Sequence, residues 1–240
     1  MSPDPLLGFE DFLLRFRDVT ERKWRDLQDP ALEVFPPVLW RRGTKWTGGL
    51  SDAEIDAVEQ RYDLSFRPDH RLFLRVLHTT TMPERTIAHL PDGGTELIDA
   101  PGFYDWQNDE AEIRRRLRLP IERLDIDEIA TISDPYWPAV WGSPPPTGGA
   151  RRQQLAERLA AAPRLVPIFG HRYVVGGGGD TAAVLSVVDY DIIIMAPDLE
   201  TYLLKELGDL IGDEEMDVPM RPWQQEIPFW GGLIELLSSC

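Results

Sequence analysis

The fold of this chain is decided by residues 165–207, LVPIFGHRYVVGGGGDTAAVLSVVDYDIIIMAPDLETYLLKEL, where short apolar runs alternate with turn residues. Runs of about four to eight residues rich in valine and isoleucine, bounded by glycine, proline or aspartate, predict β-strands. Because only short turns separate these runs, we expect the strands to be sequential antiparallel neighbours. The expected strands span 164–169, 171–175, 182–188 and 190–195. A helix from about Asp198 to Leu207 is predicted to follow them.

Helices are predicted on the N-terminal side of this stretch. Apolar residues recur at intervals of three and four over residues 5–27, which predicts an amphipathic helix. Farther along, Ser51 and Glu54 have the spacing of a capping box, in which a hydroxyl and a carboxylate satisfy free amides at a helix start. Pro68 is suited to open a second short helix.

The middle of the chain mixes a hairpin with helices. The segments TIAHL (86–90) and TELID (95–99) flank Pro-Asp-Gly-Gly, which predicts a β-hairpin because glycine accepts the positive φ of tight turns. Further helices are expected over 108–117, with Asn108 as the N-cap, and over 153–162. Residues 208–220 are strongly acidic and predict a solvated loop. The pattern predicts an α+β fold, with helices packed against a mainly antiparallel sheet, an extra N-terminal helix and a C-terminal extension.

Composition limits the class of protein. The 240 residues include 25 Lys and Arg against 41 Asp and Glu, a net charge of -16 that disfavours nucleic acid and anionic membranes as partners. The only cysteine is Cys240, so no intramolecular disulfide can form. The N-terminus lacks a signal-peptide pattern, and no apolar run approaches the roughly 20 residues of a membrane span. We therefore expect a cytoplasmic location and a single folded domain over 1–240.

Catalytic, cofactor and metal motifs are not evident. The glycines Gly176–Gly179 are followed by Asp180 and Thr181 and then a strand, whereas a phosphate-binding loop needs a lysine and a following helix. The four histidines are dispersed without metal-ligand spacing. Asp189 and Asp191 flank a predicted turn, where aspartate commonly supports the backbone. We expect no cofactor, no metal and no catalysis.

The irregular segment DPYWPAVWGSPPP (134–146) is the most suggestive part of the surface. Aromatic side chains near carboxylates favour recognition of a basic protein, because tryptophan and tyrosine supply contact area at low entropy cost. The alternative is that the tryptophans pin this loop to the core, and the two roles are compatible. The candidates here are Asp134, Tyr136, Trp137 and Trp141.

Several segments resemble the SUKH superfamily, which includes Knr-type fungal cell-wall regulators and many bacterial proteins. The segment GLSDAEIDAVEQRYDLSFRPDHRLFL (49–74) is similar to the opening signature, and WPAVWG, PRLVPIFGHRYV and VLSVVDYDIIIMAPDLETYL are similar to later motifs. The resemblance covers about 46–207 and leaves an N-terminal helical extension, 1–45, and an acidic C-terminal extension, 208–240. It implies an α+β fold without catalysis, and adds His171 and Arg172 to the candidate partner-binding residues.

Two functions follow from this resemblance. Bacterial members are commonly immunity proteins that neutralise cognate toxins, and an acidic surface suits a basic toxin domain. The alternative is a regulatory or scaffolding adaptor that binds endogenous partners. An enzyme using His171, Arg172 and Asp189 is a third and weaker hypothesis, which requires these side chains to converge. The stoichiometry of any complex stays open at this level.

Overall fold

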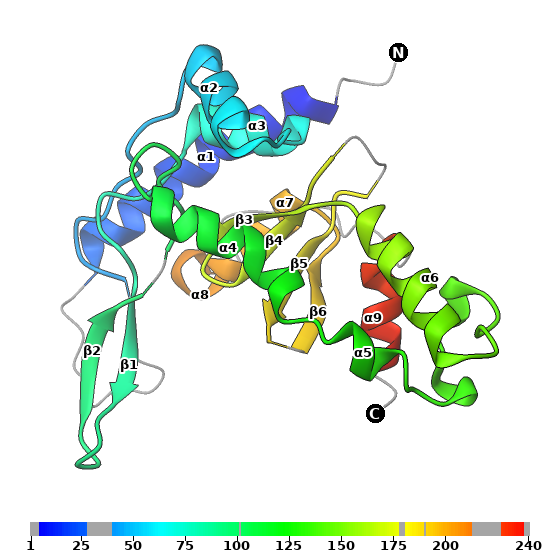
Figure 1. Cartoon of the computed structure of the whole chain (residues 1–240). Helices are drawn as coiled ribbons and strands as arrows, with labels where there is room; N and C mark the ends of the chain where they lie inside the picture. Colours follow the sequence, from blue (N-terminus) through cyan, green and yellow to red (C-terminus); the bar gives the residue numbers. More distant parts are fainter. Residues whose placement is uncertain are drawn as a thin grey trace.

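A computed structural model of the chain describes residues 5–27, 40–100, 102–177, 181–189, 191–212 and 227–237. Its centre is a four-stranded antiparallel sheet in the order β3-β4-β5-β6, and a separate two-stranded hairpin, β1-β2, extends from one side (Figure 1). The strands are β1 (Arg85–His89), β2 (Thr95–Asp99), β3 (Leu165–Phe169), β4 (Arg172–Val175), β5 (Val184–Val188) and β6 (Asp191–Ala196). The predicted α+β fold, and the prediction of sequential antiparallel strands within 164–195, are confirmed.

Helices cover both faces of the central sheet, so side chains alternate between two cores along each strand. On β3, Val166 lies in the first of these cores, whereas Leu165 lies in the second. The same alternation separates Val174 from Tyr173 on β4. Every residue of β3 is buried, which explains its continuous apolar sequence.

The first core contains the N-terminal helices. These are α1 (Pro5–Asp26), α2 (Asp52–Tyr62), α3 (Pro68–Val76), α7 (Leu199–Glu206) and α8 (Gly208–Ile211). Phe16 and Trp24 of α1 are fully buried, and both rings contact Trp46. The Trp46 indole nitrogen donates to the Thr20 hydroxyl over 2.9 Å, so this buried polar pair is satisfied. The helix expected to be an N-terminal extension is therefore part of the main core.

The second core lies on the other face of the sheet. It is covered by α5 (Ile126–Ile129), α6 (Gly148–Ala160) and α9 (Trp230–Leu237), which lie together at one end in Figure 1. The buried indole of Trp230 donates to the Pro163 carbonyl over 2.8 Å and so ties α9 to the start of β3. The last apolar segment of the chain thus completes the central packing.

Two predicted helix starts are confirmed by their caps. Ser51 accepts a hydrogen bond from the Glu54 amide while the Glu54 carboxylate accepts from the Ser51 amide, so the capping box of α2 is complete. The Asp198 carboxylate accepts from the Thr201 amide over 2.8 Å at the start of α7.

Three boundaries were predicted wrongly. Helix α4 spans Glu110–Glu122, whereas 108–117 was predicted. Asn108 does not cap it, because the Asn108 side chain donates to the Asp105 carboxylate in the preceding turn. Helix α6 begins at Gly148, capped by Thr147, five residues before its predicted start. The prediction left out the first turn of α6 because the two glycines that open it have a weak helix propensity. Of the predicted acidic loop 208–220, residues 208–211 form α8, and 213–220 lie outside the described residues.

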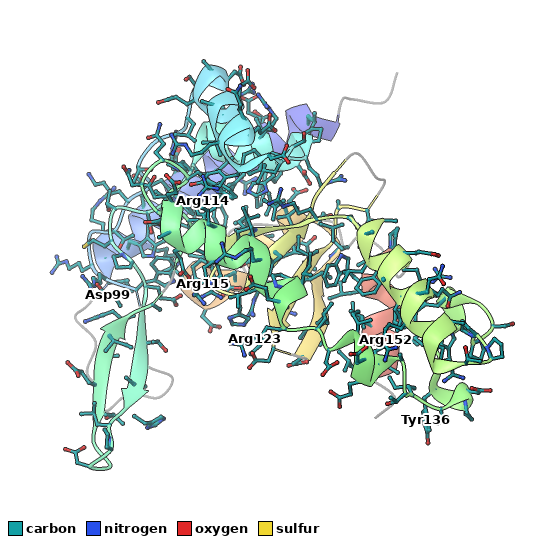
Figure 2. All side chains as sticks on the ribbon, viewed as in Figure 1. Asp99, Arg114, Arg115, Arg123, Tyr136 and Arg152 are labelled. Carbon is teal, nitrogen blue, oxygen red and sulfur yellow. The ribbon has the colours of Figure 1, made fainter. Side chains whose placement is uncertain are left out.

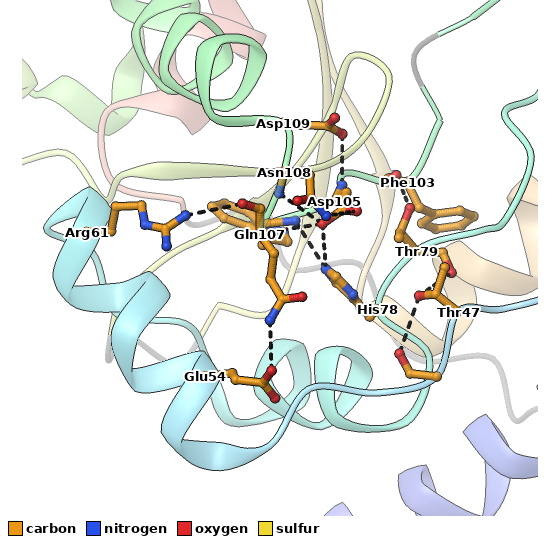
Figure 3. A network of polar contacts seen from close by, with 12 residues as sticks. Thr47, Glu54, Arg61, His78, Thr79, Phe103, Asp105, Gln107, Asn108 and Asp109 are labelled. Carbon is orange, nitrogen blue, oxygen red and sulfur yellow. Dashed lines mark hydrogen bonds and ion pairs between the residues drawn. The ribbon is translucent and has the colours of Figure 1, made fainter.

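A polar network fastens α2 and α3 to the loop before α4 (Figure 3). The buried His78 adopts the left-handed conformation, and its Nε2 accepts a hydrogen bond from the Trp106 amide over 3.1 Å. Gln107 donates to the Glu54 carboxylate over 2.9 Å, and Arg61 donates to the Gln107 carbonyl over 3.3 Å. Burial lowers the pKa of His78, which keeps the acceptor nitrogen unprotonated at neutral pH.

The buried His70 makes the stability of the fold depend on pH. Its ring is 1% exposed and packs edge-on against Phe66 and Trp106, with centroids 4.8 and 6.3 Å away. Burial lowers its pKa from 6.5 to about 3, so the unfolded chain takes up a proton that the native state excludes. Stability is therefore lost as the pH falls from about 6.5 towards 3, by about 2 kcal/mol between pH 7 and 5.

We expect His70→Phe to remove this contribution. The free energy of unfolding, measured with urea at pH 7 and pH 5, should fall by about 2 kcal/mol less in the variant than in the natural chain. Each protein serves as its own reference at pH 7, so a packing change from the larger ring does not enter the comparison. Equal losses in the two proteins would contradict the assignment.

Candidate protein-binding surface

The aromatic segment 134–146 is organised by two short 3₁₀ helices, η1 (Asp134–Tyr136) and η2 (Ala139–Trp141). Trp137 and Trp141 are 6% and 2% exposed, so the expectation that they are surface residues is wrong, and the alternative that they pin the loop holds. Their rings meet edge to face with centroids 5.4 Å apart, and Trp141 stacks on Phe229 at 5.8 Å. The segment is irregular in sequence but anchored in the second core.

Two apolar side chains remain exposed above these anchors. Tyr136 is 53% exposed and Val140, which no sequence pattern marked, is 55% exposed. Val140 borders a groove of about 490 Å³ whose floor includes Trp141 and Phe229. A rigid aromatic floor with exposed apolar residues beside it is typical of the central part of a protein interface.

Ion pairs between carboxylates and arginines join the elements next to this segment. Asp134 forms an ion pair with Arg151, whose guanidinium also lies over the Trp137 ring, 5.5 Å from its centroid. Asp127 of α5 pairs with Arg152 of α6, and Figure 2 shows Arg152 and Tyr136 at the same end of the molecule. The acidic residues between 125 and 134 are Asp125, Asp127, Glu128 and Asp134. Arg151 and Arg152 pair with two of these four carboxylates, whereas the charged residue that lines the groove itself is Arg158.

Of the remaining two candidates, His171 and Arg172, the second does not join this surface. Tyr173 belongs to the second core, so its neighbour Arg172 points to the opposite face of the sheet. There the Arg172 guanidinium donates to the Ser186 hydroxyl over 2.8 Å and lies 3.4 Å from the Glu206 carboxylate. Burial, and next the positive charge of Arg172, lower the pKa of His171 to about 4. Arg172 therefore lies on the opposite face of the sheet from Trp137 and Trp141.

The ion-pair cluster around Arg172 contains residues that sequence reasoning missed. Burial and the neighbouring Glu206 carboxylate raise the pKa of Glu84 to about 7. The fully buried Tyr202 has a raised pKa, because of its burial and then because of the nearby Glu206 charge. No spacing rule connects residues 84, 172 and 206, which come from separate elements, so the sequence offered no signal for this cluster.

The three residues of the enzyme hypothesis do not form one constellation. Asp189 has a φ of 51° at the β5–β6 turn, as expected of an aspartate in a tight turn, and its carboxylate lies 3.3 Å from Arg123. The charges that act on His171 are those of Arg172, Arg116 and Asp191. The Asp189 carboxylate thus pairs with Arg123, whereas Arg172 pairs with Glu206.

Among the residues that the structure describes, no group of three or more histidine, cysteine, aspartate or glutamate side chains has the arrangement of a metal site. Within the same part of the chain, no helix combines the length and apolarity needed to cross a bilayer. No protein-family model, curated protein or solved structure matches this chain. The resemblance to the SUKH superfamily therefore stays a prediction.

Proposed function

We propose that the chain is a non-catalytic, cytoplasmic immunity protein that binds and neutralises a basic toxin domain. The observation that carries the proposal is the apolar groove bordered by Val140, with a floor fixed by Trp141 and Phe229, in the same short segment as the exposed Tyr136 and Asp134. The resemblance to the SUKH superfamily and the net charge of -16 support the same function.

Each part of this surface suits such a partner. Tyr136 and Val140 supply apolar area that a partner can bury, and the packed tryptophans beneath them limit the entropy that binding costs. The carboxylates of residues 125–134 attract a basic surface and raise the association rate, an effect that salt weakens. The experiment that tests the proposal is binding of the purified chain to the product of an adjacent toxin gene, together with protection from its toxicity.

Tyr136→Ala is expected to weaken this complex. Removing an aromatic anchor at an interface centre commonly costs about 2 kcal/mol or more, which is about a 30-fold rise in Kd. Isothermal titration calorimetry measures the change. The thermal midpoint should stay within about 2 °C of the natural chain, because Tyr136 is exposed and outside both cores.

Ile121→Ala is the matched control for this variant. Ile121 lies on α4, is 48% exposed, and does not border the groove. Its truncation should leave Kd unchanged within about twofold. Equal losses in the two variants, or none in either, would place the interface elsewhere. A chain encoded without a neighbouring toxin gene would favour the regulatory or scaffolding adaptor as its function.

A further inference from the structure

The β1–β2 hairpin projects from the body at the end opposite to the candidate surface (Figure 1). Figure 2 places Asp99, at the base of the hairpin, far from Tyr136. Leu90 and Ile98 on this hairpin are exposed, at 38% and 43%. A two-stranded hairpin without a covering layer is only marginally stable in water, so a projecting one is suited to gain stability from a partner.

The hydrogen bonds at the two ends of the hairpin reveal which backbone groups point outward. The Ala100 amide donates to the Glu84 carbonyl over 2.9 Å, and the Leu90 amide donates to the Gly94 carbonyl over 2.9 Å. In an antiparallel ladder, bonded and non-bonded residue pairs alternate. With the observed register, Thr95, Leu97 and Asp99 of β2 fall in non-bonded pairs and direct their amides and carbonyls away from β1.

These outward groups of β2 form an open edge. The sheet has only two strands, and no residue in the described ranges forms a hydrogen bond to the backbone of Thr95, Leu97 or Asp99. Four of the five β2 residues are exposed, whereas three of the five in β1 are half-buried. The edge of β2 is therefore the more accessible of the two.

The side chains of β2 indicate the chemistry that the edge would accept. The strand carries Glu96 and Asp99 and no basic residue, and the Asp99 carboxylate is paired with Arg41. Leu97 and Ile98 point to opposite faces, so an added strand would meet one apolar residue on each face. A lysine or arginine beside Glu96 would form a cross-strand pair of opposite charge.

We propose that the outer edge of β2 binds an extended basic segment of a protein partner as an added strand. Backbone hydrogen bonds to Thr95, Leu97 and Asp99 supply the affinity, and the charge of Glu96 selects a basic sequence. The inference rests on the proposed function only for the sign of the partner's charge. It assigns a second contact region, separate from the groove at Val140.

A capped hexapeptide, Thr-Lys-Val-Val-Lys-Thr, is the probe. Its sequence is the same in both directions, so it places a lysine beside Glu96 whether it pairs parallel or antiparallel. In an NMR titration of the full chain, the amides of Thr95, Leu97 and Asp99 should shift and gain protection from hydrogen exchange. The twin peptide with glutamate in place of both lysines should bind at least about tenfold more weakly.

Leu97→Pro tests the edge itself. Proline removes the outward amide of β2 and leaves the bonds to β1 in place, and Kd for the lysine peptide should rise at least about tenfold. Ile87→Pro is the matched control, because Ile87 occupies the equivalent outward position on β1. It should leave Kd within about twofold. Retained protection of the Thr86 and Ile98 amides from hydrogen exchange in both variants shows that the hairpin is intact, because these two residues form a bonded pair.

Several results would overturn the proposal. These are a lysine peptide that produces no shifts, protection of the β1 amides in place of those of β2, and equal binding of the glutamate peptide. Sedimentation that reveals a dimer abolished by Leu97→Pro would identify a second copy of the chain as the occupant, which also overturns it. Toxin binding by the Tyr136 variant is measured independently, so failure here is distinct from failure of the proposed function.

Discussion

Replacing Gly49 with alanine is expected to cost more than about 4 kcal/mol of stability, because the added methyl group has no room. A Cβ at this position would lie 1.5 Å from the carbonyl oxygen of Arg75 and 2.1 Å from its carbonyl carbon. Both atoms belong to the backbone of α3, next to the 2.9 Å hydrogen bond from Leu50 to Leu74. Relief would require α3 to move away from the segment before α2. Urea unfolding followed by circular dichroism measures the loss.

Gly48→Ala is the control for that experiment. Gly48 has a φ of 88° but nothing within 4 Å of an added Cβ, so its substitution meets backbone strain without a clash. The expected cost is about 1 to 2 kcal/mol. Similar losses for the two neighbours would show that chain conformation, and not the close approach of α3, governs this junction.

Replacing Gly232 with alanine is the second change with a large expected effect. An added Cβ would lie 2.1 Å from the Trp141 indole nitrogen and 2.3 Å from the adjacent ring carbon. Because Trp141 is packed between Trp137 and Phe229, the ring cannot simply turn aside. We expect a loss of about 3 kcal/mol, measured by urea unfolding, and weaker binding of the proposed toxin partner, because Trp141 also forms the floor of the groove.

Two comparisons give this prediction its specificity. Gly149→Ala in α6 adds the same methyl group where nothing lies within 4 Å, and should raise stability by up to about 1 kcal/mol. The double variant Gly232→Ala/Trp141→Phe should lose less than the sum of the two single losses, because the smaller ring makes room for the methyl group. Additive losses would mean that Gly232 and Trp141 do not compete for the same space.

Local signals in the sequence were enough for most elements. The strands of 164–195 are apolar runs separated by short turns. The length of these runs and the turn residues that bound them identify the strands without tertiary information. Ser51 and Asp198 mark helix starts because their side chains accept from amides within the first turn, and Pro68 does so because its fixed φ and missing N–H suit the first helical position. Helix α6 shows the limit, since its first turn begins with two glycines and is held by the Thr147 cap.

The candidate site was predictable only in part. Asp134 and Tyr136 do lie on the surface, but Trp137 and Trp141 are buried, because residues in a proline-rich segment follow no helical or strand period. The exposed Val140 lies between Trp137 and Trp141 in the sequence, and no sequence pattern indicated its exposure. His171 and Arg172 were grouped with the aromatic segment, yet the alternation along β4 turns Arg172 to the face of α7 and Glu206.

The amino-acid sequence by itself determined the antiparallel order of β3–β6, the hairpin and the capped helices, because these depend on contacts between residues close along the chain. Only the tertiary structure decided that α1 and α9 complete two cores on opposite faces of the sheet. It alone also decided that Glu84, Arg172 and Glu206 form one charged cluster and that Gly232 faces Trp141. The physical reason is that such contacts join residues far apart in the chain, and packing selects them only once the whole fold is formed.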